Sequence, residues 1–294
     1  MRHFLLLPLI AGIGYAVGTL FIKRAAAHGV GPWRTAFVCN MAVAVFSLPF
    51  FLLGAGGSLP WGKWYQPVIA AATFFIGQIF TFYAIEKGEL SIATPILGTK
   101  VIFVALLTLL LIGVAVPLKL WLAAFLTAFS LVLLGGGKAT DGSRRKFWLT
   151  ALWAGLAAFH FGVTDTLAQK WAPGWGGARF SSVVFLVCAL LSLGLIPFFH
   201  APLRALKGEG RKYLMWGMVV AAGQGAILYY AIGRYGHATS INVVYNFRAL
   251  ATILLVWIVG HWFGNREGEA GHGVMARRLI GSALLLFSIG LVMS

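Results

Sequence analysis

Acidic residues are scarce in this chain: only 7 of its 294 residues are Asp or Glu, and charged residues make up 10% of the total. Hydrophobic residues make up 60%, which leaves too little polar surface to cover a soluble domain of this length. The composition therefore excludes a soluble globular protein and predicts an integral membrane protein. The apolar runs are continuous and do not alternate with polar residues, so they predict membrane helices and not a β-barrel.

Cysteine is nearly absent as well. Cys39 and Cys188 both lie inside apolar runs, which predicts buried free thiols and neither a disulfide nor a metal site. No ATP-binding loop is present, which argues against transport driven by ATP hydrolysis. The few carboxylates form no cluster with His, so we expect no catalytic residues, no cofactor and no enzyme activity.

Basic residues, in contrast, are plentiful, and the net charge is +16 with 23 Lys and Arg. In a soluble protein this balance would suggest a nucleic-acid partner. Here the basic residues lie almost entirely between apolar runs, where they act as topology signals. The sequence contains no basic-aromatic module, so we expect the lipid bilayer and a small-molecule substrate as partners, and no nucleic acid.

Ten apolar runs have about the 20 residues that a helix needs to cross the hydrocarbon core. They occur near residues 3–22, 34–54, 66–86, 92–113, 117–135, 148–170, 180–199, 213–233, 238–260 and 277–293. The sequence therefore predicts an all-α integral membrane protein with ten transmembrane helices.

Two segments far apart in the chain share an uncommon pattern. Gly77–Lys87 reads GQIFTFYAIEK, and Gly223–Arg234 reads GQGAILYYAIGR. Other matches keep the same order, such as Pro49 with Pro197. Because Gln, Pro and Tyr are uncommon in apolar stretches, we interpret the pattern as an internal repeat, an organisation that is typical of transporters.

The repeat divides the chain into residues 1–137, a linker at 138–147, and residues 148–294. Each half holds five helices, and because five is odd, the second half must cross the membrane in the opposite direction. The sequence thus predicts two inverted five-helix repeats with both termini on one face. Loops on the other face carry 15 basic residues against 6 on the face of the termini, so we place the termini outside the cytoplasm.

Two basic residues, Lys100 and Arg248, fall inside predicted helices at equivalent positions of the two repeats. A charge at membrane depth costs about 2.5–3.5 kcal/mol on insertion scales, so each needs an explanation. We expect the two to face each other across a central cavity and to bind a carboxylate or phosphate. The alternative is that Lys100 extends to the interface and that Arg248 binds backbone carbonyls.

Polar residues near Arg248 could line the same cavity. Asn242 and Tyr245 precede it by six and three residues, a spacing that places all three on one helix face, with Asn246 nearby. The Asn side chains could equally join neighbouring helices. Pro95, near the start of the fourth run, interrupts backbone hydrogen bonding and could act as a hinge.

Gln78 and Gln224 form a symmetric pair, for which substrate contact and helix contact are both open. Asp165 is the one acid well inside an apolar run. It is a candidate for proton coupling; the alternative is a structural pair with a cation or a hydroxyl group.

Several short motifs are similar to those of a known family. They are Tyr83–Gly88 (YAIEKG), Ser91–Pro95 (SIATP) and, in the second copy, Tyr230–Gly236 (YAIGRYG). On these motifs the chain resembles the drug/metabolite transporter superfamily, in its ten-helix EamA-like branch. The resemblance implies a two-repeat basket with a central substrate site and alternating access.

These observations together predict a secondary active or facilitative transporter of small polar metabolites that carry a carboxylate or phosphate, with amino acids and organic phosphates as the leading classes. The candidate substrate-binding residues are Arg248, Lys100, Asn242, Tyr245, Asn246, Gln78 and Gln224. We expect a monomer or homodimer in a bacterial inner membrane.

Two alternatives come from other functional classes. An exporter of cationic or aromatic drugs would use Asp165 as its coupling group. An intramembrane lipid-linked transferase would need clustered acids at one membrane face, which this sequence lacks.

Overall fold

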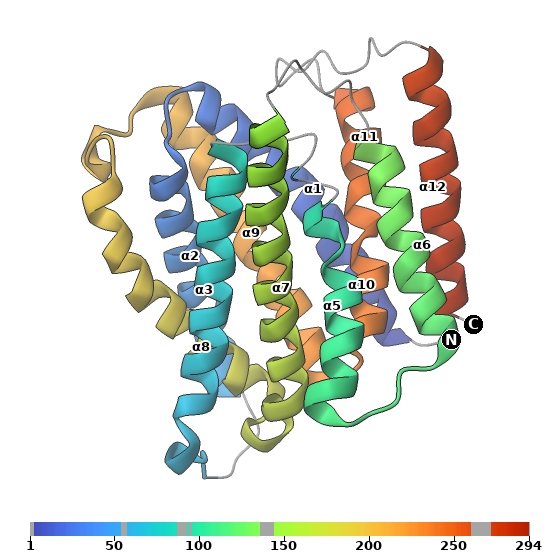
Figure 1. Cartoon of the computed structure of the whole chain (residues 1–294). Coiled ribbons are helices and arrows are strands. Elements are labelled where there is room, and N and C mark those ends of the chain that lie inside the picture. Colours follow the sequence, from blue (N-terminus) through green and yellow to red (C-terminus); the bar gives the residue numbers. More distant parts are fainter. Residues whose placement is uncertain are drawn as a thin grey trace.

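The structure is a computed structural model that describes residues 3–53, 58–86, 93, 96–135, 144–259 and 272–293. Throughout these ranges the regular structure is helical, with no strand (Figure 1). The chain ends marked in Figure 1 lie at the same end of the helix bundle. This placement is expected for an even number of membrane crossings.

Helices occupy all ten predicted runs. The first half contains α1 (Leu6–Ala27), α2 (Pro32–Leu53), α3 (Tyr65–Glu86), α5 (Lys100–Leu107) and α6 (Leu118–Gly135). The second half contains α7 (Arg144–Trp175), α8 (Gly177–Ser192), α9 (Gly208–Tyr235), α10 (Ala238–Tyr245), α11 (Phe247–Val259) and α12 (His272–Met293). The all-helical class is therefore confirmed.

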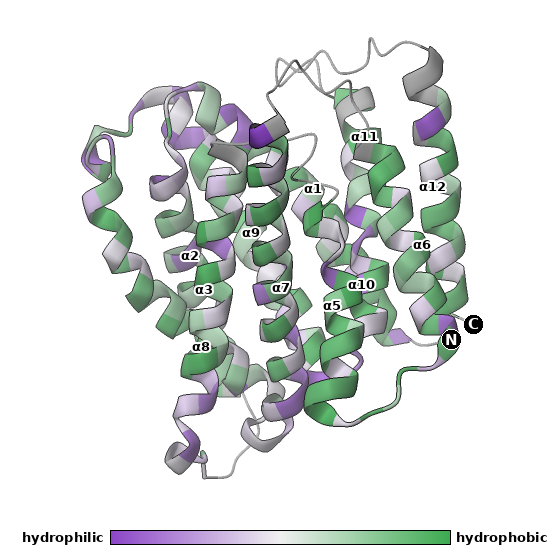
Figure 2. Cartoon of the chain, in the orientation of Figure 1, coloured by the Kyte–Doolittle hydropathy of each residue, from purple (hydrophilic) through white to green (hydrophobic). Residues whose placement is uncertain are grey.

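Among the described residues, 7 helices are long and apolar enough to cross a membrane. Three shorter apolar helices accompany them, at Ile96–Ile112, Leu118–Leu134 and Leu279–Met293. Large apolar side chains point outward; Leu52, for example, is 81% exposed and Leu118 is 74% exposed. Hydrophobic colouring covers the outer helix surfaces in Figure 2, as a lipid-facing surface requires.

One helix start differs from the sequence-based expectation. The helix α7 begins at Arg144, within the predicted linker at 138–147 and before the predicted run that starts near residue 148. The earlier part of that linker and Pro95 lie outside the described residues. The helix α7 is long because helix-compatible residues continue without a break after Arg144. The basic residues at its start precede the apolar part of the helix.

The fourth and ninth predicted helices are each interrupted, which corrects the expectation of two continuous helices. In the ninth, Asn246 separates α10 from α11 with a ψ of −8°, and its backbone N–H is shared between the carbonyls of Asn242 and Val243. In the fourth, Thr99 has a ψ of −6° and its hydroxyl donates to the Ile96 carbonyl at 2.6 Å. Such back-bonding tightens and bends a helix.

Helices from the two halves interleave. The helix α1 packs against α9, α3 packs against α7, α2 packs against α8, and α6 packs against α12. Further contacts join α1 to α11 and α5 to α7. Neither half therefore forms a separate body, and side chains from both halves meet inside the bundle.

Small residues allow the closest of these approaches. A Cβ atom on Gly12 of α1 would lie 3.2 Å from the backbone nitrogen of Arg248 and 3.2 Å from the carbonyl oxygen of Tyr245. The helix α1 is thus pressed against the interruption between α10 and α11. Gly14 makes a similar approach to Gln224, at 3.0 Å from its Cβ atom, so the glycine pattern of α1 serves close packing.

We predict that Gly12→Ala lowers the stability of the folded protein by about 1–3 kcal/mol, because the added methyl group meets backbone atoms that cannot rotate away. Gly155→Ala is the matched control, since a Cβ atom there has no neighbour within 4 Å. Thermal unfolding in detergent measures both. Equal midpoints for the two variants would contradict the close approach of α1.

Candidate functional site

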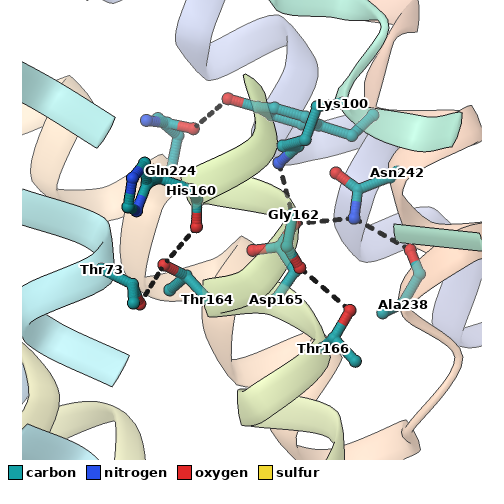
Figure 3. Close-up of polar contacts among 11 residues, drawn as sticks. Thr73, Lys100, His160, Gly162, Thr164, Asp165, Thr166, Gln224, Ala238 and Asn242 are labelled. Carbon is teal, nitrogen blue, oxygen red and sulfur yellow. Dashed lines mark hydrogen bonds and ion pairs between the residues drawn. The ribbon is translucent and has the colours of Figure 1, made fainter. Parts of the chain in front are cut away.

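A carboxylate and an ammonium group form an ion pair between the two halves of the chain. Lys100 Nζ lies 2.8 Å from Asp165 Oδ2, and the two side chains are only 13% and 7% exposed. Asn242 Nδ2 donates to the same oxygen at 2.8 Å and also to the Ala238 carbonyl. Figure 3 shows Lys100, Asp165 and Asn242 converging from α5, α7 and α10.

Burial makes this cluster sensitive to its balance of charge. Two opposite charges removed from water must compensate each other, and removal of either one leaves the other unpaired. Lys100 therefore does not extend to the interface, which was the alternative to a role at depth. Asp165 pairs with a cation, which agrees with the structural alternative for this residue.

Arg248 contacts two aromatic rings. Its Cζ atom is 4.6 Å from the ring centroid of Tyr15 and 4.7 Å from that of Tyr245. The two rings are nearly perpendicular, with their centroids 6.1 Å apart, so they meet neighbouring sides of the guanidinium group and do not enclose it. Among the described residues Arg248 forms no ion pair, whereas Asp165 is paired with Lys100.

Tyr245 connects the two predicted cations. Its ring centroid lies 5.8 Å from Lys100 Nζ as well as 4.7 Å from Arg248 Cζ. Its hydroxyl group donates to Gln224 Oε1 at 3.1 Å. Arg248, Tyr15 and Gln224 are only partly buried, so their surface remains accessible beside the tyrosine ring.

The helix interruptions position both cations at helix starts. Lys100 is the first residue of α5, and Arg248 is the second residue of α11. The amino ends of helices carry partial positive charge. The cations therefore add to that charge, and the combined potential attracts an anion. Asn246, at the interruption itself, is 4% exposed.

Gln78 does not join this group through any contact in the described part of the structure. Its amide pairs in both directions with Asn40, at 2.9 and 3.0 Å, and Asn40 also donates to Ser192 Oγ at 2.7 Å. These bonds link α3 to α2 and α8. The geometry thus favours helix contact for Gln78, while Gln224 remains beside Tyr245.

Sequence reasoning missed Tyr15 and Asn40. Neither carries a charge, and neither lies in a motif that the two repeats share. The one signal near Tyr15 is the spacing of Gly12, Gly14 and Gly18 around it, which favours close packing of the helix but does not show against which other helix. Among the described residues, no group of three or more His, Cys, Asp or Glu side chains could hold a metal ion.

Comparisons with known proteins find a family model that matches the first half of the chain. Residues 3–136 match the model of the EamA-like transporter family. No curated protein matches the chain. A solved structure described as "Crystal structure of protein" is similar, with a TM-score of 0.79 and 17% sequence identity, and the match covers 99% of this chain and 98% of that chain. At this identity the likeness shows the fold alone.

We predict that Lys100→Met destabilises the protein by about 3–5 kcal/mol, because it leaves the carboxylate of Asp165 buried without a cation. The double variant Lys100→Met/Asp165→Asn should recover most of that loss. Chemical unfolding in detergent measures the difference.

Lys212→Met is the control for this prediction, since its pair with Glu209 is long, at 3.6 Å, and exposed. Exposed pairs contribute about 0–1 kcal/mol. If Lys100→Met behaved like Lys212→Met, the ion pair would not stabilise the bundle.

Proposed function

We propose that this chain, whose residues 3–136 match the model of the EamA-like transporter family, is a membrane transporter that carries small polar metabolites bearing a carboxylate or phosphate group, by alternating access. Amino acids and organic phosphates are the leading substrate classes. The observation that supports this proposal is Arg248, a cation inside the helix bundle that no described carboxylate neutralises. A transporter has a use for such a charge, because a substrate can supply the missing anion.

An oxyanion suits the surroundings of Arg248. The guanidinium group contacts the rings of Tyr15 and Tyr245, and a carboxylate or phosphate could accept two hydrogen bonds from its N–H groups. Lys100 lies on the same tyrosine ring and would be the second cation. Gln224, Asn242 and Asn246 would supply polar contacts at its border.

Two inverted repeats, at residues 1–137 and 148–294, would provide the movement. The pattern of helix contacts supports this proposal. In the two repeats α1 corresponds to α7, α3 to α9 and α5 to α11. The observed contact between α1 and α9 therefore has a counterpart in the observed contact between α7 and α3. The contact between α1 and α11 has a counterpart in that between α7 and α5. Rocking of one repeat against the other would expose the site to each side in turn.

The orientation that we propose places both termini outside the cytoplasm, in a bacterial inner membrane. The supporting observation is the excess of basic residues, 15 against 6, on the opposite face. Loops rich in Lys and Arg are retained on the cytoplasmic side.

An exporter of cationic drugs is less well supported. Such a protein needs an unpaired acid at depth to attract its substrate. Asp165 is the buried acid among the described residues, and Lys100 already pairs with it at 2.8 Å. The site as a whole therefore carries an excess of positive charge, which repels a cation.

We predict that Arg248→Ala weakens the binding of anionic substrates by about 10- to 100-fold, the range expected for loss of charge-assisted hydrogen bonds. A thermal-shift screen of the purified protein would use amino acids, sugar phosphates, carboxylates and cationic amines as test compounds. Compounds that stabilise the wild-type protein would then be tested for uptake into proteoliposomes.

Two further variants make the screen specific. Arg211→Ala removes an exposed arginine near the start of α9 and should respond like the wild type. Arg248→Lys keeps the charge but cannot form paired hydrogen bonds, so it should fall between wild type and Arg248→Ala. Stabilisation by cationic amines alone, or full anion uptake by Arg248→Ala, would refute the anion site.

A further inference from the structure

We propose that Asp165 and Asn242 form a proton site, and that one proton enters the protein together with each substrate anion. This inference rests on the anion site at Arg248 and Lys100 proposed above. The inference explains how the negative charge of the substrate anion is balanced. When the anion binds Lys100, Lys100 leaves Asp165, and Asp165 accepts a proton and remains paired with Asn242.

Asn242 has an acceptor that nothing fills. The residue is 1% exposed, and its amide nitrogen donates to Asp165 Oδ2 and to the Ala238 carbonyl. Its Oδ1 atom is buried and has no hydrogen-bond partner in the part of the chain that the structure describes. A buried acceptor without a donor is unfavourable. The arrangement is therefore incomplete in the present state and suited to one more proton.

Asp165 has an oxygen that can carry that proton. Lys100 Nζ and Asn242 Nδ2 both contact Oδ2, and within the described ranges no hydrogen bond involves Oδ1. A carboxylic acid and a carboxamide are complementary, because each offers one donor and one acceptor. A protonated carboxyl group of Asp165 could thus donate to Asn242 Oδ1 once the two groups turn to face each other.

Lys100 links this proton to the substrate. In the present state its ammonium group pairs with the carboxylate of Asp165, and it lies against the same tyrosine ring as Arg248. An anion bound to Arg248 offers the ammonium group a second partner. If Lys100 moves to that anion, the carboxylate becomes an uncompensated buried charge, which is strongly unfavourable. Protonation of Asp165 removes this charge.

The exchange conserves charge and atoms. Before it, the site holds two cations, Lys100 and Arg248, and the carboxylate of Asp165. After it, the site holds the same two cations, the substrate anion and a neutral carboxylic acid. The O–H bond of Asp165 forms as an O–H bond of a hydronium ion breaks, which leaves a water molecule on the side of entry. A monoanion would therefore cross together with one proton and no net charge.

Other ionisable groups near Asp165 do not replace it. Those within electrostatic reach are Lys100 of α5, Tyr229 of α9, Tyr245 of α10 and Arg248 of α11. His160, earlier on α7, packs against the rings of Phe80 and Phe159 in tilted and edge-on arrangements. On the side of α3, Thr73 bonds to Thr164 and is uncharged, and Cys188 of α8 donates to the Ala71 carbonyl. None of these groups is a second carboxylate.

The test counts protons during anion binding. The purified full-length protein, weakly buffered with a pH-indicator dye, is titrated with sulfate and with acetate, neither of which takes up protons near neutral pH. We expect uptake of about one proton per bound anion, as linkage between the two sites requires. Wild-type binding should therefore weaken as pH rises.

Asp165→Asn imitates the protonated acid and releases Lys100 for the anion. This variant should bind both anions at least as tightly as the wild type, without proton uptake and without pH dependence, whereas loss of a purely structural contact would weaken binding. Glu209→Gln, which removes the exposed partner of Lys212, should keep the wild-type proton count. If Asp165→Asn fails to fold, an infrared difference spectrum of the wild type should show a protonated carboxyl band appearing with sulfate.

The outcomes separate the two proposals. Anion binding by the wild type without proton uptake, or uptake that persists in Asp165→Asn, would overturn the proton site and leave the anion site intact. Failure of the wild type to bind either anion would overturn the anion site, and the proton site with it.

Discussion

The buried ion pair between Lys100 and Asp165 is the interaction on which the rest of the site depends. It joins α5 of the first half to α7 of the second, and Asn242 adds α10 through the same carboxylate oxygen. Because one acid is occupied by one lysine, Arg248 is left without a described carboxylate partner. The scarcity of acids in the sequence is thus the basis of the proposed anion site, because among the described residues no carboxylate forms an ion pair with Arg248.

Most of the fold could be predicted from apolar length. A helix that crosses a membrane must satisfy its own backbone hydrogen bonds, so runs of sufficient length become helices wherever they occur. The interruptions at Thr99 and Asn246 could not be predicted, since neither residue is a helix breaker of the strength of Pro or Gly. One depends on a hydroxyl bonding back to Ile96, and the other coincides with the close approach of Gly12.

The candidate site was predictable in part, for a physical reason. Lys100, Arg248 and Asp165 stand out because charge at membrane depth is costly, and helical spacing adds Asn242 and Tyr245. Their partners were not predictable, because a sequence does not show which helices meet. Gln78 and Gln224 occupy matching places in the sequence, yet Gln78 is paired with Asn40 while Gln224 accepts from Tyr245. The two glutamines therefore have different roles because their neighbours differ between the two halves, although their own positions in the sequence match.

The central claim is that Arg248 and Lys100 bind one anion between them. The most direct measurement is a crystal structure of the protein soaked in selenate, whose selenium atom is located by anomalous scattering. The account predicts an anomalous peak within hydrogen-bond reach of the Arg248 guanidinium, with Lys100 Nζ directed to the selenate and separated from Asp165. Selenate bound elsewhere in the bundle, with the Lys100–Asp165 pair intact and Arg248 unoccupied, would contradict it.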